Sequence, residues 1–278
     1  MKTTKKIIVS ASGGKDSTAT LITAIQKYGK DNVIGVFCDT GWEHPETYKY
    51  IEYLKDKTGV EIITIKNEKF NGIPDLIRHK KIFPSSIRRF CSIYMKVMPM
   101  INFLMKFCLD SPDTQIENWI GIRANESLKR QERYGNLTPN DTFIYGDIYD
   151  LTKKQAKILN NIKLRYPVVN LSANDIYKII VNAGLDINPL YYKGQDRVGC
   201  YPCIMSGIKA YKTVWQDKTG KERILFLKDL ENEINKNNEY KTTLKPGLSA
   251  EELIKRFKND DLQIDMFEPE FICGFCNI

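Results

Sequence analysis

The stretch SASGGKDST, residues 10–18, lies between a strand pattern and a helix pattern and constrains the fold more than any other part of the chain. The preceding residues 5–10, KKIIVS, are a short apolar run typical of a buried strand. After the glycines, apolar residues recur at helical spacing from Asp16 to Tyr28, and Gly29 ends the pattern. A glycine turn in this position lies at the carboxyl end of a strand, where open α/β sheets bind ligands.

The same alternation continues along the chain and predicts the fold class. Residues 32–40 form a second strand pattern that ends at Asp39, and residues 60–66 form a third, with a helix pattern over 44–59 between them. Strands that alternate with helices form a parallel sheet with right-handed crossovers. We therefore expect an α/β fold with a doubly wound, mostly parallel sheet. It is completed by a helix begun or kinked at Pro99, a strand at 114–123, a strand or hairpin within 142–150 and a helix over 172–184.

The character of the sequence changes after Gly207, which divides the chain into units of 1–207 and 208–278. The second unit carries two amphipathic, charged helices near 222–238 and 249–258. A length of 278 residues with 42% hydrophobic residues suits one main core with a smaller appended unit. The two units are therefore predicted to be a sheet domain and a helical C-terminal extension.

Composition excludes some functions and leaves others open. No apolar run approaches the roughly 20 residues that span a membrane, and the first apolar run is shorter than the roughly 7–15 residues of a signal peptide. We therefore expect a cytoplasmic protein with no membrane partner. The formal net charge of +8 fits either solvated surface lysines or an anionic substrate or nucleic acid.

The glycine turn has the chemistry of a phosphate cradle. Gly13 and Gly14 let backbone amides face a ligand without a Cβ in the way, and the helix that follows adds unpaired amides and positive potential. The turn is not a Walker loop, because Val9 stands where its first glycine belongs, and no G-x-G-x-x-G is present. Three hydroxyl side chains add donors to this turn: Ser10, Ser12 and Ser17.

Four of the seven cysteines form two Cys-x-x-Cys pairs. Cys200 and Cys203 lie in a turn-rich stretch, and Cys273 and Cys276 lie near the end of the sequence. In a cytoplasmic chain this spacing indicates metal or redox chemistry rather than structural disulfides. Two such pairs that meet in space present four thiolates, which bind zinc or an iron–sulfur cluster. The second pair would then clasp the helical extension back onto the sheet domain.

Five stretches in order resemble a known family. SGGKDS, residues 12–17, resembles the pyrophosphate loop of the ATP-pyrophosphatase (adenine nucleotide α-hydrolase-like, HUP) superfamily. Four later stretches are similar to motifs of the phosphoadenylyl-sulfate (PAPS) reductase family within it: DTGWEHPETYKYI (39–51), RRFCSIYMKVMPM (88–100), GIRANESLKR (121–130) and NPLYYKGQDRVGCYPC (188–203). Together they cover roughly residues 5–207, which the resemblance therefore identifies as a nucleotide-binding domain.

The resemblance implies roles for the matching positions. An adenine nucleotide would place its phosphate or sulfate end against Ser10, Ser12, Gly13, Gly14, Asp16 and Ser17, with Lys15 and Asp16 as catalytic candidates. Asp39, Thr40 and Gly41 would border the nucleoside, and Arg88, Lys96, Arg123 and Arg130 would contact anionic groups. For four residues the sequence also allows another role. Lys15 is otherwise a solvent-exposed lysine, Asp39 a strand-end cap and Arg88 part of a solvated helix face, while Glu126 either orients Arg123 or contacts the ligand.

The resemblance also bears on the cysteines. Family members that reduce adenylyl sulfate hold a four-iron–four-sulfur cluster with an adjacent cysteine pair and a later Cys-x-x-Cys. Here Cys200 and Cys203 match the later pair, but Cys91 is followed by Ser92. Cys273 and Cys276 would complete the cluster, or a zinc site in its place. Cys91 is then a free, catalytic thiol near the nucleotide, a buried core cysteine or a cluster ligand.

Two reactions follow from the resemblance. The first reduces a sulfonucleotide, adenylyl sulfate (APS) or PAPS, to sulfite with a thioredoxin-type donor. The second is an ATP-dependent sulfurtransferase reaction, in which Mg²⁺-bound ATP adenylylates a nucleic acid that is then thiolated. The sequence leaves the oligomeric state open.

Overall fold

The computed structural model describes residues 5–236 and 238–259 and shows one sheet of six strands in the order β3-β2-β1-β4-β6-β5. All neighbouring strands pair in parallel except β5, which runs antiparallel to β6. The predicted doubly wound, mostly parallel sheet is thus confirmed. The strands are β1 Lys5–Ser10, β2 Val33–Asp39, β3 Ile62–Lys66, β4 Gln115–Trp119, β5 Thr142–Ile144 and β6 Lys163–Arg165.

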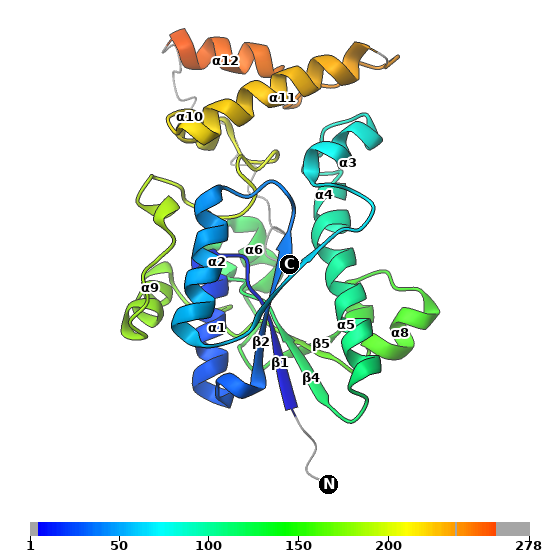
Figure 1. Cartoon of the computed structure of the whole chain (residues 1–278), viewed down its shortest axis with the longest axis vertical. Coiled ribbons are helices and arrows are strands. Elements are labelled where there is room, and N and C mark those ends of the chain that lie inside the picture. Colours follow the sequence, from blue (N-terminus) through cyan, green and yellow to red (C-terminus); the bar gives the residue numbers. More distant parts are fainter. Residues whose placement is uncertain (1–4, 237, 260–278) are drawn as a thin grey trace.

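Helices cover both faces of the sheet (Figure 1). On one face α1 (Lys15–Tyr28), α2 (Pro45–Thr58) and α9 (Ala173–Asn182) pack over Ile7 and Val9. On the other, α5 (Met98–Asp110), α7 (Tyr145–Ile148) and α8 (Lys153–Leu159) pack over Ile8. Successive strand side chains point to opposite faces, so a strand that is apolar at consecutive positions is buried on both sides. This explains why KKIIVS lies at the centre of the sheet.

Residues 90–110 form a nearly continuous helical segment with a widened turn inside it. The segment consists of α4 (Phe90–Ser92), a π-helical turn η2 (Ile93–Val97) and α5, whose first turn contains Pro99. Proline lacks the amide that an interior helical position needs, so a new helix begins there. The prediction that Pro99 starts or kinks a helix is confirmed.

Two predicted strands are shorter than their sequence patterns. The strand expected over 114–123 ends at Trp119, because the chain turns there to bring Gly121 against the first turn of α1. Residues 142–150 form the short edge strand β5 and then α7. The remaining short elements of this unit are η1 Lys30–Asn32, α3 Ile73–Lys80, η3 Ala124–Glu126, α6 Leu128–Tyr134 and η4 Pro189–Tyr191.

The C-terminal helices form a separate layer beyond the carboxyl ends of the strands (Figure 1). The layer consists of α10 (Ile208–Trp215), α11 (Lys218–Lys236) and α12 (Ala250–Asn259), and the sequence pattern does not predict the first of them. Its apolar faces share one core with α3 and the segment around Cys91. Within the described residues no helix is long and apolar enough to span a membrane. Cys273 and Cys276 lie outside the described residues.

Candidate functional site

The glycine turn occupies the carboxyl end of β1, as the sequence predicts, and is fixed by its own hydrogen bonds. The Ser12 amide donates to Ser17 Oγ at 3.1 Å, and that hydroxyl donates to the Gly14 carbonyl at 2.9 Å. Gly13 has a φ of +73°, and a Cβ there would lie 3.0 Å from a methyl group of Thr47. Only glycine fits this position without strain.

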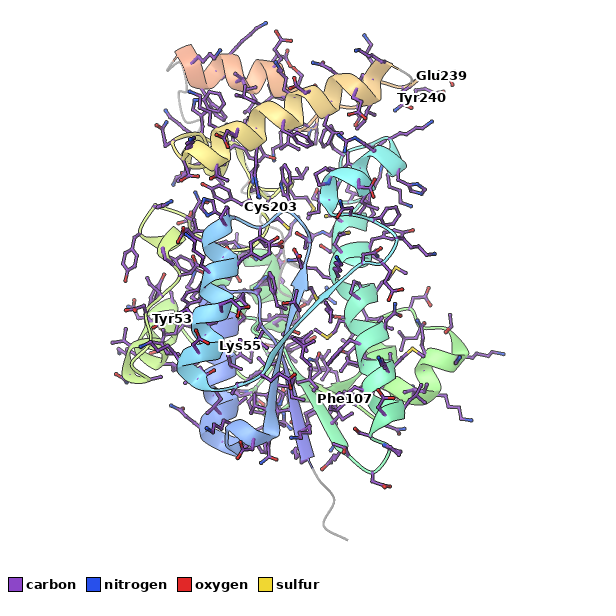
Figure 2. All side chains as sticks on the ribbon, in the orientation of Figure 1. Tyr53, Lys55, Phe107, Cys203, Glu239 and Tyr240 are labelled. Carbon is purple, nitrogen blue, oxygen red and sulfur yellow. The ribbon has the colours of Figure 1, made fainter. Side chains whose placement is uncertain are left out.

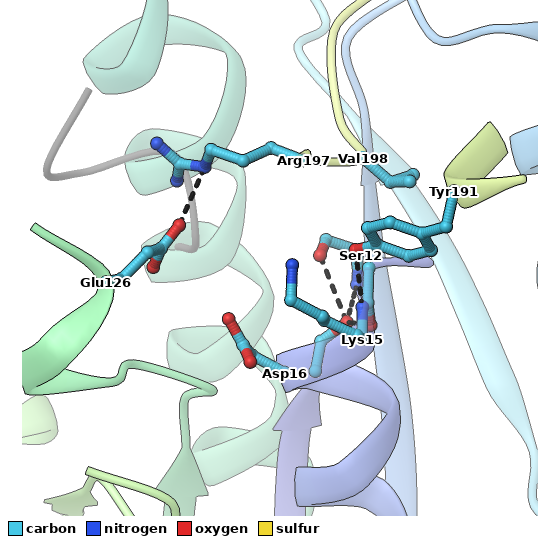
Figure 3. A pocket seen from close by; sticks show the side chains of 9 residues that line it. Ser12, Lys15, Asp16, Glu126, Tyr191, Arg197 and Val198 are labelled. Carbon is cyan, nitrogen blue, oxygen red and sulfur yellow. Dashed lines mark hydrogen bonds and ion pairs between the residues drawn. The ribbon is translucent and has the colours of Figure 1, made fainter. Parts of the chain in front are cut away.

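A polar pocket opens in front of this turn (Figure 3). On one side Ser12, Lys15 and Asp16 line it, and on the other Glu126 and Arg197 form an ion pair of 2.8 Å. Gly14, Ser17, Tyr191 and Val198 complete the lining. The pocket therefore combines loop amides, hydroxyls and cations, which is the chemistry that binds phosphate or sulfate.

Asp16 and Arg123 form a buried ion pair at the floor of this region. Arg123 Nε lies 2.6 Å from Asp16 Oδ1, and both side chains are buried. Burial raises the pKa of the Asp16 carboxyl, and the charge of Arg123 opposes that rise. Burial also lowers the pKa of Lys15, whose Nζ donates to the Asp196 carbonyl at 2.8 Å. The fold brings Lys15, Asp16 and Arg123 close together, and the Asp16 carboxylate points toward Arg123.

Glu126 holds two arginines together. Its carboxylate pairs with Arg130 Nη1 as well as with Arg197, so it contacts Arg130 rather than orienting Arg123 in the described structure. Arg130 is fully buried, yet its Nε and Nη2 have no hydrogen-bond partner among the residues that the structure describes. Buried donors without a partner are costly, and a bound anion is one way to satisfy them. Of these two arginines, Arg197 lines the pocket.

A second cavity adjoins the first and is lined by the carboxyl ends of β1 and β2. The two cavities share Ser12, and the second also contains Ser10 and the buried Glu43 and Lys96. The Ser10 hydroxyl is buried and has no hydrogen-bond partner within 5–236 and 238–259. Ala11, Val36, Phe37, Cys38 and Gly199 supply a largely apolar wall. The cavity therefore combines a few polar groups with an apolar wall.

Residues 39–41, which the sequence predicts to border the nucleoside, lie beside this cavity. The hydrogen bonds of their side chains are made to other residues of the chain. Asp39 accepts hydrogen bonds from the Gly41 amide and the Tyr48 hydroxyl, at 2.8 and 2.7 Å. Gly41 has a φ of +64°, and a Cβ there would lie 2.9 Å from the backbone of Gly72. Thr40 is buried and donates to Glu43 at 2.6 Å. Asp39 thus caps a strand end in the described structure.

A third cavity collects the cysteines. Cys91, Cys200 and Cys203 line it together with Lys96 and Thr40, whose hydroxyl lies 3.6 Å from Cys200 Sγ. Figure 2 places Cys203 at the junction between the sheet domain and the helical layer. Lys96 lines both this cavity and the one at β1 and β2, so the two are neighbours. Cys91 is thus brought to the other cysteines and is not part of the lining of the first two cavities.

Burial disfavours the thiolate form of two cysteines in this cavity. Burial raises the pKa of Cys200 to about 12 and that of Cys91 to about 11. Burial opposes the charge of Lys96, but the facing Cys200 and Glu43 outweigh it and raise its pKa. Cysteine thiolates are ligands that thiophilic metals prefer, so the residue types of this cavity suit such a metal. Within residues 5–236 and 238–259, however, no three Cys, His, Asp or Glu side chains are arranged to hold a metal ion.

Arg88 does not join any of these cavities. Its side chain is exposed, and its described hydrogen bonds are made by the backbone: the amide donates to Ser85 Oγ at 3.1 Å, and the carbonyl accepts from the Ser85 amide at 3.2 Å. The neighbouring Ile87 is also exposed. This segment therefore forms part of the surface.

The comparison with known proteins decides the family. The model of the phosphoadenosine phosphosulfate reductase domain matches residues 6–206. The chain belongs to this family. The resemblance identified from the five motifs is thereby confirmed, and the match ends where the helical layer begins.

Individual relatives agree with this family. A phosphoadenosine 5'-phosphosulfate reductase of Buchnera aphidicola is 28% identical over 69% of this chain and 68% of its own length. Adenosine 5'-phosphosulfate reductase 1 of Bacillus subtilis is 27% identical over 66% of this chain and 67% of its own. An uncharacterised protein of Methanocaldococcus jannaschii is 32% identical over 73% of this chain, which spans only 37% of that protein.

A solved structure of PAPS reductase from Candida auris, a phosphate complex, aligns with a TM-score of 0.48 and 14% identity. The alignment covers 71% of this chain and 82% of that one.

Sequence reasoning missed several residues of the site. Glu43, Tyr191 and Arg197 reach it only through tertiary contacts. All three lie inside two of the quoted motifs, so a polar side chain within a motif was an available signal. Nothing in the sequence indicates that Glu126 and Arg197 meet.

Proposed function

We propose that this chain binds an adenine nucleotide with its anionic end in the pocket at the glycine turn and its nucleoside in the adjoining cavity. The observation that carries this proposal is that the two cavities share the lining residue Ser12 at the carboxyl ends of the central strands. Loop amides, Lys15 and Arg197 supply positive potential at one end. Apolar side chains supply a wall at the other.

We further propose that the bound nucleotide is a sulfonucleotide, APS or PAPS, and that it is reduced to sulfite. A thiolate attacks the sulfonate sulfur, the bond from sulfur to the phosphate oxygen breaks, and the nucleotide leaves with that oxygen. A thiol of a reduced thioredoxin-type donor then attacks the protein-derived sulfur of the S-sulfonated cysteine, so that sulfite leaves and a mixed disulfide forms. The second thiol of the donor resolves this disulfide, which returns the cysteine to its reduced form and leaves the donor as an intramolecular disulfide. Cys91 is the thiol of this chain that we propose for the first step, because Lys96 lies between its cavity and the nucleotide cavity.

The cysteine cavity is the proposed place for a thiolate-bound metal. Cys200 and Cys203 would hold it with the pair 273 and 276, and Cys91 is an alternative ligand. A bound iron–sulfur cluster, or zinc in its place, would supply positive charge that keeps these buried thiols ionised.

The test compares products from several nucleotides. Anaerobically purified chain is incubated with APS, PAPS or ATP, with reduced thioredoxin, and products are separated by chromatography. Sulfite that appears together with AMP or adenosine 3',5'-bisphosphate supports the proposal, and its absence with both sulfonucleotides refutes it. Lys15→Ala is expected to weaken nucleotide binding. Lys49→Ala, in an exposed ion pair on α2, is the matched control.

A second function is favoured by one feature of the surface. Arg88 and the fully exposed side chain of Ile87 lie on a loop before α4, and burial lowers the pKa of the adjacent Arg89, with Arg133 and Arg197 as nearby like charges. A basic rim near the nucleotide suits a nucleic acid, as in ATP-dependent thiolation with Mg²⁺. This alternative predicts release of AMP and pyrophosphate from ATP, and nucleic-acid affinity that falls steeply with salt.

A further inference from the structure

The helical layer holds the backbone around the cysteine cavity through one arginine. Arg223 of α11 donates from Nη1 to the carbonyls of Trp42 and Tyr201, at 2.9 and 2.7 Å. Its Nη2 donates to the carbonyl of Glu43 at 2.8 Å. The guanidinium also lies 4.7 Å from the centre of the Trp42 ring. One side chain thus joins two segments that are far apart in the sequence.

These two segments bracket Cys200. The Tyr201 amide donates to the Trp42 carbonyl at 2.7 Å, and Glu43 forms an isolated β-bridge with Cys200. The Glu43 carboxylate in turn accepts from Thr40, whose hydroxyl lies 3.6 Å from Cys200 Sγ. A shift of the Glu43 backbone would therefore move both the strand-end segment and the cysteine.

A second cation of the helical layer holds the other end of the cysteine turn. Lys245, between α11 and α12, donates from Nζ to the carbonyls of Ile204 and Ser206. Its ammonium group lies 4.1 Å from the centre of the Tyr211 ring. The backbone on both sides of Cys203 is thus tied to the layer that follows residue 206, where the family match ends.

We infer that Arg223 is a positioning residue for the cysteine cavity and that Lys245 supports it from the opposite flank. This inference rests on the proposed function of that cavity. The helical layer is then part of the site, because it sets the backbone from which Cys200 and Cys203 project. Arginine suits the role, since its planar guanidinium presents several donors in a fixed arrangement that lysine does not reproduce.

The test measures how well the cavity protects its thiols. Reduced, chelator-treated full-length protein is alkylated with iodoacetamide, and the rates at Cys200 and Cys203 are followed by peptide mass spectrometry, with the buried Cys38 as internal reference. Arg223→Ala is expected to speed alkylation of both by about tenfold or more, because the charge-assisted bonds that oppose local opening are lost. Arg223→Lys is expected to give an intermediate rate.

Arg78→Ala is the matched control. Arg78 of α3 pairs with Glu233 of α11 at 2.9 Å, so it also joins the sheet domain to the helical layer, but at an exposed site without a cysteine. Its alkylation rates are expected to equal those of the wild type.

Wild-type rates at Cys200 and Cys203 in folded Arg223→Ala would overturn the inference. So would equal acceleration at Cys38, since that shows general loosening. If Arg223→Ala does not fold, Arg223→Lys decides, and a wild-type rate there overturns the inference as well. Titration calorimetry with ATP, APS and PAPS on the wild type separates the two proposals. A failure to bind these nucleotides contradicts the proposed function and leaves the alkylation result unaffected.

Discussion

Gly121→Ala is expected to damage the glycine turn without adding any polar group. A Cβ at Gly121 would lie 2.7 Å from the carbonyl group of Asp16 and from the Ser17 amide nitrogen. That distance is about 0.7 Å short of the 3.4 Å at which ordinary contact begins. Because the obstructing atoms are backbone atoms at the first turn of α1, the clash is relieved only by moving the turn or the strand end after β4.

The magnitude follows from overpacking. Forcing an extra carbon into a packed interior costs about 1–3 kcal/mol of unfolding free energy, which for a chain of this size lowers Tm by roughly 2–4 °C per kcal/mol. A displaced turn no longer presents its amides to an anion. We therefore expect affinity for inorganic pyrophosphate to fall by about tenfold or more, since shifts below 1 Å already weaken a positioned site.

The assay pairs this variant with Gly207→Ala. A Cβ at Gly207 meets no atom of the described part of the chain within 4 Å, and Gly207 precedes α10 with an ordinary φ of −68°. Both variants are unfolded with urea and titrated with pyrophosphate. Wild-type stability and wild-type pyrophosphate affinity in Gly121→Ala would refute the close approach of residue 121 to the turn and the reasoning built on it.

Three further outcomes are expected. Burial lowers the pKa of His44 below its usual 6.5 despite a hydrogen bond to a carboxylate, so the folded state binds the proton less well than the unfolded state and stability falls as the pH drops below about 6.5. The variant His44→Asn retains a hydrogen-bond acceptor for the helix start. It is expected to reduce the change in unfolding free energy, measured with urea, between pH 7 and 5, and an unchanged pH dependence contradicts this. Glu126→Ala leaves the buried Arg130 without its carboxylate, which costs about 3–5 kcal/mol of unfolding free energy, and sulfate is expected to restore part of it; equal stability with and without sulfate opposes an anion site there. In anaerobically purified protein, metal and sulfide analysis is expected to show iron, and the visible spectrum a band near 400 nm. Both are expected to be lost in a Cys200→Ser, Cys276→Ser double variant. Colourless protein that contains zinc would instead make the cysteines a structural clasp.

Local patterns determined the fold class of this protein. Consecutive apolar residues at 7–9, a glycine turn and a helical repeat after it leave few arrangements other than a central parallel strand followed by a crossover helix. The same patterns located the glycine turn, because a positive φ at Gly13 and a helix start are properties of neighbouring residues. The proline at position 99 likewise acted locally.

Tertiary structure decided which side chains meet. The pairing of Asp16 with Arg123 joins residues 107 positions apart, and Glu126 meets Arg197 in the lining of the pocket. Such contacts depend on how loops leave neighbouring strands, and the sequence carries no local record of that geometry. For the same reason Cys91 joined Cys200 and Cys203 in one cavity.

The helical layer shows the division most clearly. Amphipathic spacing predicted α11 and α12, since periodicity is a local property. Neither spacing nor composition indicated that Arg223 would donate to three carbonyls from two distant segments. From the sequence alone, an arginine on an amphipathic helix is expected to be solvent-exposed. Only the packing of that helix over the carboxyl ends of the strands brings its charge to the backbone around the cysteines.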